Sequence, residues 1–183
     1  MGTREIILQC ARELFMERGY NNVSMRDIAE TAGIRVGNLT YHFPRKELLV
    51  EAIYSAPESK MYTPETLESP EEFREYFRHL LGVQRRAAFY FDSYIQLSQT
   101  SEYFRDIQLR RIKALRRLFL SGLNGLAEKG VIAPERREGE FARRVENLLT
   151  ALMLRLPGEE RQFAPPESDE AVLTRLMELA GLE

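Results

Sequence analysis

The sequence has few of the side chains that build disulfide frameworks, metal clusters and hydrolytic centres. Its 183 residues include one cysteine, Cys10, and two histidines, His42 and His79. A single thiol cannot form an internal disulfide or a cysteine metal cluster. No aspartate or glutamate spacing recommends either histidine as a catalytic or metal-binding group. We therefore expect neither a cofactor nor a bound metal.

Sequence motifs of several enzyme classes are also missing. The chain has no G-x-S-x-G nucleophile elbow, no G-x-x-x-x-G-K phosphate loop, no H-E-x-x-H zinc motif and no paired cysteines. Each of these motifs places a reactive or phosphate-binding group at a fixed point on a turn or helix. Their absence argues against an enzyme.

Long apolar runs are absent as well. Charged residues interrupt the N-terminal segment at positions 4, 5, 12 and 13 and leave no apolar stretch long enough for a signal peptide. The longest apolar run, around residues 148–154, is well short of the roughly 20 residues that a membrane-spanning helix requires. We therefore expect a cytoplasmic protein that makes no use of a membrane.

What the chain does have is helical periodicity throughout. Apolar residues recur three and four positions apart, with no strand pattern and no internal repeat, which predicts an all-α fold. Residues 57–69 contain prolines, serines and acids, and this composition indicates a loop or domain border. Start and stop residues place one helix before Gly19, one after Ser24, one at about residues 35–42, one from Pro44, one from Pro70, two at residues 87–99 and 103–129, one between Pro134 and Pro157, and one over residues 172–180.

The segment from Met25 to Lys46 has the pattern of a helix-turn-helix, in which two short helices cross around a tight turn. Ser24 and Asp27 form an S-x-x-D capping motif at the start of the first helix. Ala29 and Gly33 suit the close helix contact and the unusual backbone angles of the turn. The second helix, which the following proline ends, can lay its N-terminal residues on base edges in a DNA major groove.

This segment and its surroundings resemble the TetR (tetracycline-repressor) family of bacterial transcription regulators. The resemblance implies a three-helix DNA-binding domain over residues 1–54 and a helical domain for ligand binding and dimerisation over residues 55–183. One departure is Thr40, where these proteins more often carry a tyrosine or another large residue. The C-terminal two thirds match only in helical pattern. The matching residues, from Thr3 to about Tyr54, include Thr3-Arg4, Phe15, Gly19-Tyr20, Ser24 to Gly33, Gly37 to Phe43, and Lys46-Glu47-Leu48-Leu49.

The helix-turn-helix reading also predicts which side chains meet DNA. Side chains at the start of its two helices lie where base edges would be met, and a glycine there would let the backbone approach closely. The alternative is that Tyr41 is a core aromatic and Arg35 a solvated charge, while Phe43 is expected in the core. The residues predicted to meet base edges are Arg26, Arg35, Val36 and Asn38, with Gly37 allowing the close approach. The predicted phosphate contacts are Ser24, Thr40, Tyr41, His42 and Lys46, and Thr3 and Arg4 complete the predicted DNA-binding set.

The charge balance bears on assembly. A formal net charge of −2 leaves few phosphate contacts per subunit, so tight binding should require two subunits. Two recognition helices about 34–36 Å apart can enter successive major grooves, which predicts a pseudopalindromic site. In the resembled family the two C-terminal helices form the dimer interface, although they could instead only close the subunit's core. The candidate interface residues are Leu148, Leu149, Leu152, Leu156, Leu173 and Leu176.

Aromatic residues in the middle of the chain suit a mostly apolar cavity with a few orienting hydrogen bonds. In the resembled family such a cavity receives a small inducer, here expected to be apolar or amphipathic. Aromatic residues at helical spacing are also common in plain cores, so that alternative stays open. The candidate ligand-binding residues are Tyr62, Phe77, Phe89, Tyr90, Tyr94, Tyr103 and Phe104.

The predicted function is a homodimeric repressor that binds a double-stranded DNA operator and is released by the inducer. Two alternatives remain at this point. The protein could activate transcription, or it could be a ligand-independent adaptor or architectural DNA-binding protein whose helical body serves only for dimerisation or protein binding.

Overall fold

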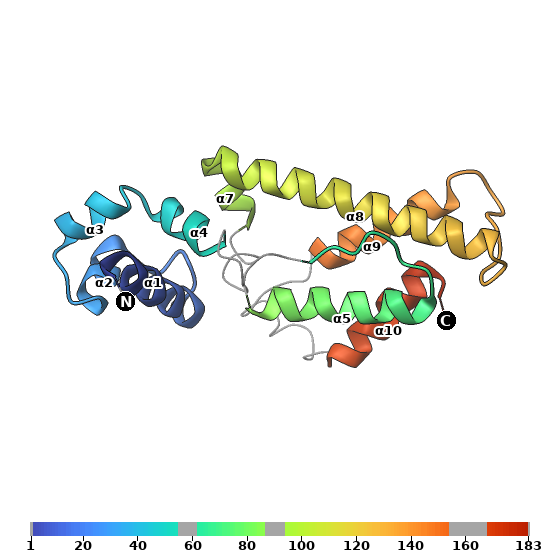
Figure 1. The fold of residues 1–183 in the computed structure, drawn as a ribbon, viewed down its shortest axis with the longest axis horizontal. Helices are drawn as coiled ribbons and strands as arrows, with labels where there is room; N and C mark the ends of the chain where they lie inside the picture. Colours follow the sequence, from blue (N-terminus) through green and yellow to red (C-terminus); the bar gives the residue numbers. More distant parts are fainter. Residues whose placement is uncertain (1, 55–61, 87–93, 154–167, 183) are drawn as a thin grey trace. The chain divides into compact units, whose positions relative to one another are not determined.

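The computed structural model describes residues 2–54, 62–86, 94–153 and 168–182. Every regular element within these ranges is a helix, which confirms the expected all-α fold (Figure 1). No helix in the described ranges combines the length and the apolar character needed to cross a membrane. The helices are α1 (Thr3–Arg18), α2 (Met25–Thr31), α3 (Val36–His42), α4 (Lys46–Tyr54), α5 (Pro70–Arg86), α7 (Tyr94–Thr100), α8 (Glu102–Glu128), α9 (Glu140–Met153) and α10 (Asp169–Ala180).

Most helix ends lie where the start and stop residues predict them. The backbone N–H of Gly19 donates to the carbonyl of Phe15 at 3.0 Å and ends α1. Pro70 is the first residue of α5, where its missing N–H leaves no helical hydrogen bond unmade. Helix α8 stops two residues before Gly130. The predicted ends at residues 87 and 157 lie outside the described residues.

Two helices begin later than predicted. Helix α4 starts at Lys46, two residues after the expected Pro44. Helix α9 starts at Glu140 rather than directly after Pro134. The Glu135 carboxylate accepts hydrogen bonds from the backbone N–H groups of Gly139 and Phe141, at 3.3 and 2.6 Å. These bonds hold a turn ahead of α9.

The chain forms two compact units. One takes in residues 1–60 and 86–108 and the other residues 61–85 and 109–183, as far as the structure describes them. In the first unit α1 packs on α2 and α4, and α2 packs on α3. Its buried side chains come from all of these helices and from α7 and the start of α8. They include Ile7, Phe15, Ile28, Leu39, Leu49, Leu97 and Phe104.

The second unit is built from α5, α9, α10 and the part of α8 after residue 108. Helix α5, green in Figure 1, lies next to α10, in red, and Arg85 of α5 pairs with Asp169 of α10. Helix α9 lies beside the yellow part of α8, where Arg116 pairs with Glu146 of α9 at 2.8 Å. Aromatic rings fill its centre: Phe73 stacks on Phe119 at 6.0 Å, and Phe77 lies 5.5 Å from the same ring. Leucines of α9 and α10 complete this core.

The compact units divide the chain differently from the predicted domain border at residue 54. Residues 94–108 belong with the first unit because Leu97 and Phe104 are buried in its core. Tyr54 lies edge-on to Phe104 at 6.4 Å within that unit. The functional division into residues 1–54 and 55–183 therefore remains a prediction.

Candidate nucleic-acid interface

The first helix of the helix-turn-helix, α2, begins at the predicted cap. The Ser24 hydroxyl accepts a hydrogen bond from the Asp27 N–H at 3.2 Å. The Asp27 carboxylate accepts from the Ser24 N–H at 2.7 Å and from its hydroxyl at 2.6 Å. These bonds, led by the hydroxyl, lower the pKa of Asp27. Both donors of Ser24 are thus used within the cap, which counts against its predicted phosphate contact.

The turn between α2 and α3 depends on Gly33. Its φ of 66° lies in the left-handed region, which L side chains rarely adopt. Its N–H donates to Glu30 O at 3.0 Å, and the N–H of Ile34 donates to Ala29 O at 2.9 Å. This pair of bonds is the Schellman pattern that ends helices. Ala29 is buried, as the close crossing of the two helices predicts.

The second helix, α3, turns most of its residues outward. Of its seven residues, Leu39 is fully buried and anchors the helix in the core of the first unit. Val36 is 41% exposed and Tyr41 83% exposed, and both are large apolar or aromatic side chains. Gly37 and Asn38 are exposed too. These four residues are free of the core of the first unit and available to another molecule.

Gly37 has no structural reason to be glycine. A Cβ atom added there would meet no other heavy atom within 4 Å. Its backbone angles are not in the left-handed region either, unlike those of Gly33. Glycine inside a helix costs roughly 0.5–1 kcal/mol relative to alanine. The residue therefore costs stability without serving the packing of the chain.

The C-terminal end of α3 carries the predicted backbone contacts. Tyr41 and His42 lie edge to face, 5.3 Å apart, so the alternative of Tyr41 as a core aromatic is not supported. The Thr40 hydroxyl donates to the carbonyl of Gly37 at 3.2 Å, which uses its donor inside the helix. Phe43, by contrast, is buried as expected.

Four further predicted residues lie on α1 and α2 and at the entry to α3. Arg4 is exposed, and its guanidinium lies 5.1 Å from the ring centre of Phe43, just past the end of α3. Thr3, at the first position of α1, is exposed, as are Arg26 in the first turn of α2 and Arg35 ahead of α3. The structure therefore keeps the guanidinium groups of Arg4, Arg26 and Arg35 exposed on the unit that contains the helix-turn-helix.

Lys46 differs from the other predicted contacts because its ammonium turns inward. The Nζ atom donates to the backbone carbonyls of Tyr20 and Val23 at 2.7 and 2.8 Å. It also lies 4.0 Å from the ring centre of Tyr20. Sequence reasoning missed this partner. The sequence signal for it is the pair Gly19-Tyr20, which is part of the family resemblance and places an aromatic ring in the turn after α1.

The predicted ligand-binding aromatics are dispersed in the structure. Phe77 is fully buried in the second core and Phe104 in the first, which supports the alternative that these two rings are core residues. Tyr103 is partly buried beside Phe104, at 5.4 Å, whereas Tyr62 is 65% exposed. Phe89 and Tyr90 and the side chain of Tyr94 lie outside the described residues.

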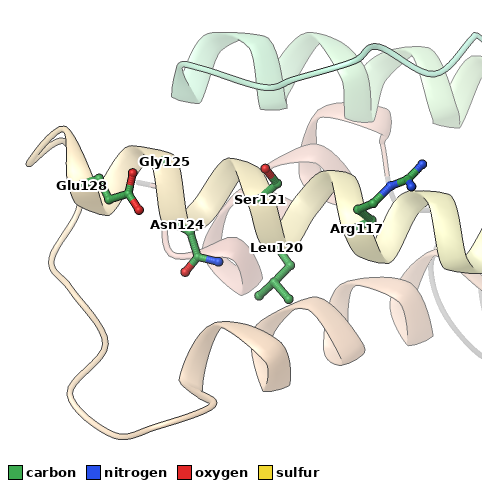
Figure 2. A pocket seen from close by; sticks show the side chains of 6 residues that line it. All are labelled: Arg117, Leu120, Ser121, Asn124, Gly125 and Glu128. Carbon is green, nitrogen blue, oxygen red and sulfur yellow. The ribbon is translucent and has the colours of Figure 1, made fainter.

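An open hollow of about 440 Å³ lies along α8 in the second unit. None of the predicted aromatics whose side chains the structure describes lines it, and its lining is mostly exposed and polar. It therefore lacks the apolar enclosure that is typical of a small-molecule cavity. Figure 2 shows the lining residues on successive turns of the helix: Arg117, Leu120, Ser121, Asn124, Gly125 and Glu128.

The predicted dimer leucines lie inside the second unit. Their side chains are covered by their own chain, so their burial favours the alternative that they close the subunit core. A dimer that uses α9 and α10 would need other faces of these helices. Leu156 lies outside the described residues. The residues buried in this way are Leu148, Leu149, Leu152, Leu173 and Leu176.

Comparisons with known proteins point to one family. Residues 7–53 match the family model described as bacterial regulatory proteins, tetR family. The HTH-type transcriptional regulator UidR of Escherichia coli K12 is 45% identical over 51 residues, which are 28% of this chain and 26% of UidR. The chain thus matches about a quarter of that relative's length.

Two solved structures resemble nearly the whole chain. A TetR-family transcriptional regulator from Marinobacter aquaeolei VT8 has a TM-score of 0.73 at 22% identity, covering 98% of this chain and 90% of its own. The structure of AibR in complex with isovaleryl coenzyme A and operator DNA has a TM-score of 0.61 at 19% identity, covering 99% and 98%. At these identities both likenesses establish a shared fold.

Proposed function

We propose that the chain is a transcriptional regulator of the tetR family of bacterial regulatory proteins and that it inserts α3 into a DNA major groove. UidR is named a transcriptional regulator, and the matched segment contains the whole helix-turn-helix. A groove-binding helix needs an outer face whose residues are free of the protein core.

The outer face of α3 carries the proposal. It exposes Val36, Asn38 and the large ring of Tyr41, and it keeps a glycine at position 37 that packing does not require. A missing side chain lets the helix backbone approach base edges and phosphates closely. A phenol at the end of the helix can donate a hydrogen bond to a phosphate.

We further propose that two copies bind together and repress transcription. Arg4, Arg26 and Arg35 are exposed on the first unit, but the chain as a whole is slightly acidic. Since each phosphate contact contributes only modestly, one copy would bind weakly at physiological salt. Two α3 helices about 34–36 Å apart would read two half-sites of a pseudopalindrome.

A small apolar or amphipathic molecule is the proposed release signal. AibR, which shares the fold, was solved with an acyl coenzyme A and operator DNA. A ligand that binds more tightly to an arrangement with the wrong α3 spacing would shift the population away from the DNA-bound form. A metabolite that binds the protein and leaves its affinity for the operator unchanged would contradict this part of the proposal.

The decisive experiment is to sequence the genomic fragments that the purified protein retains. We expect a small set of fragments sharing a pseudopalindrome, and enrichment of none would overturn the proposed function. Arg35→Ala should then relax base preference at defined positions, because a bidentate arginine contact discriminates by about 1–3 kcal/mol. Lys113→Ala removes the same charge from an exposed position on α8 and should leave the preference unchanged.

A further inference from the structure

Lys46 and Glu47 are the first two residues of α4, and both contact Tyr20. We propose that these three residues, here called the Tyr20 latch, fix the helix-turn-helix in its DNA-binding geometry. Lys46 is then a positioning residue rather than a phosphate contact. The proposal deepens the proposed function and rests on it.

The latch holds Tyr20 from two sides. On one side, the Lys46 ammonium lies 4.0 Å from the ring centre and donates to the Tyr20 carbonyl at 2.7 Å. On the other, the Tyr20 phenol donates to the Glu47 carboxylate at 3.1 Å. Tyr20 itself is buried and Lys46 and Glu47 are half-buried, so these contacts are partly shielded from water. Burial, and then the adjacent Glu47 charge, raise the pKa of Tyr20 and keep the phenol a donor.

The Lys46 ammonium has little left to offer to DNA. An ammonium group has three N–H donors, and two of them bind the carbonyls of Tyr20 and Val23. The centre of the Tyr20 ring lies 4.0 Å from the same Nζ atom. Burial also lowers the pKa of Lys46, as expected of an amine partly withdrawn from water. A phosphate contact would require Lys46 to leave both carbonyls.

The latch can fix the orientation of α3 because its bonds join the chain before α2 to the chain after α3. The two carbonyls belong to the turn that leads into the Ser24 cap of α2, and the ammonium comes from Lys46, the first residue of α4, which follows the end of α3 at His42 by four positions. The bonds span 26 and 23 residues of sequence. They therefore close a loop that contains the whole helix-turn-helix and tie its entry to its exit. Releasing them would free α3 to change its angle while each helix stays intact.

The first test is Lys46→Met, which keeps the aliphatic chain and removes the ammonium. Affinity for a retained DNA fragment is measured over a series of salt concentrations. We expect affinity to fall about tenfold, as for loss of a charged hydrogen bond, with an unchanged salt slope. A phosphate contact would instead lower the slope by about 0.9. A lowered slope without a loss of thermal stability would overturn the latch.

Two control variants separate positioning from charge and from stability. Arg45→Met removes the same charge one residue earlier, from an exposed side chain, and should not alter the melting temperature. Val50→Ala weakens the buried face of α4 without touching the latch. With each variant assayed well below its melting temperature, Val50→Ala should bind DNA normally. Equal affinity losses in Val50→Ala and Lys46→Met would show that Lys46 only stabilises the fold, and they would overturn the proposal.

A measurement without DNA keeps the latch testable if the proposed function fails. Amide hydrogen exchange reports local opening of the backbone. In Lys46→Met we expect faster exchange at Val23, Ser24 and Asp27, with Arg45→Met unchanged. Tyr20→Phe, which removes only the phenol hydroxyl, should give a smaller change in the same direction. Unaltered exchange in Lys46→Met refutes the latch, whereas faster exchange in a protein that retains no DNA refutes only the proposed function.

Discussion

Helices α3 and α9 are both amphipathic, but they differ in how many of their residues they bury. Helix α3 buries one of its seven residues, Leu39, and exposes an aromatic ring and a valine. Helix α9 buries five of its fourteen residues in the second core. Packing therefore accounts for the apolar choices in α9 and leaves those on the outside of α3 without a structural reason. The outer residues of α3 are therefore available to contact another molecule.

The largest expected effect is in α9. Leu148 is fully buried, so Leu148→Ala should lower the free energy of unfolding by about 2–5 kcal/mol. Its exposed neighbour Asn147 provides the control, and Asn147→Ala should change stability by less than about 0.5 kcal/mol. Urea unfolding followed by circular dichroism measures both. Similar losses in the two variants would mean that α9 is not held by its apolar face.

A smaller loss is expected for Gly122→Ala in α8. A Cβ at this position would lie 2.7 Å from Cζ of Phe73 and 3.1 Å from the carbonyl oxygen of Leu67. The Phe73 ring is fully buried and stacked on Phe119, so it has no room to turn away. Overpacking of this kind costs about 1–3 kcal/mol. The same unfolding measurement should show that loss, and an unchanged stability would place the ring elsewhere.

The same substitution at position 37 should have the opposite sign. Gly37→Ala meets open space and should raise the free energy of unfolding by about 0.5–1 kcal/mol. If the backbone of α3 approaches DNA, affinity for a retained fragment should nevertheless fall, measured by fluorescence anisotropy. Gly125→Ala in α8 also meets open space and serves as the matched control, stabilising the fold and leaving affinity intact. If Gly37→Ala bound DNA as well as the parent protein, the proposed difference between α3, whose outer face contacts DNA, and α9, whose apolar face packs in the core, would not hold.

The features that sequence reasoning predicted correctly depend on short stretches of chain. The Ser24–Asp27 cap and the Gly33 turn connect residues three to five positions apart. Residue type and spacing determine such contacts locally, so the bounds of α2 and the turn before α3 could be read from the sequence. The exposure of Tyr41 followed from its place on the same short helix.

The features that it missed depend on contacts between distant segments. Lys46 is a solvated cation by residue type, and only the folded turn 26 residues earlier brings two carbonyls to its ammonium. The leucines of α9 have the same ambiguity. A wide apolar face fits a subunit core as well as a dimer interface, and the burial of Leu148 and Leu149 among residues of α5, α8 and α10 favours the core.

The smallest expected effect concerns acid stability at the start of α2. The Ser24 hydroxyl, and then its backbone N–H, lower the pKa of Asp27 below its unfolded value of about 3.9. Because the folded state binds the proton less tightly, this stabilisation is present above that unfolded value. It is lost as the pH falls through the lower, folded value. Asp27→Asn keeps an acceptor that does not titrate, so its melting temperature should fall less between pH 5 and pH 2 (about one unit above and two units below the carboxyl pKa) than that of the parent. Glu140 in α9 also has a lowered pKa and continues to titrate in both proteins, so a parallel decline would assign the acid sensitivity to the second unit rather than to the helix-turn-helix.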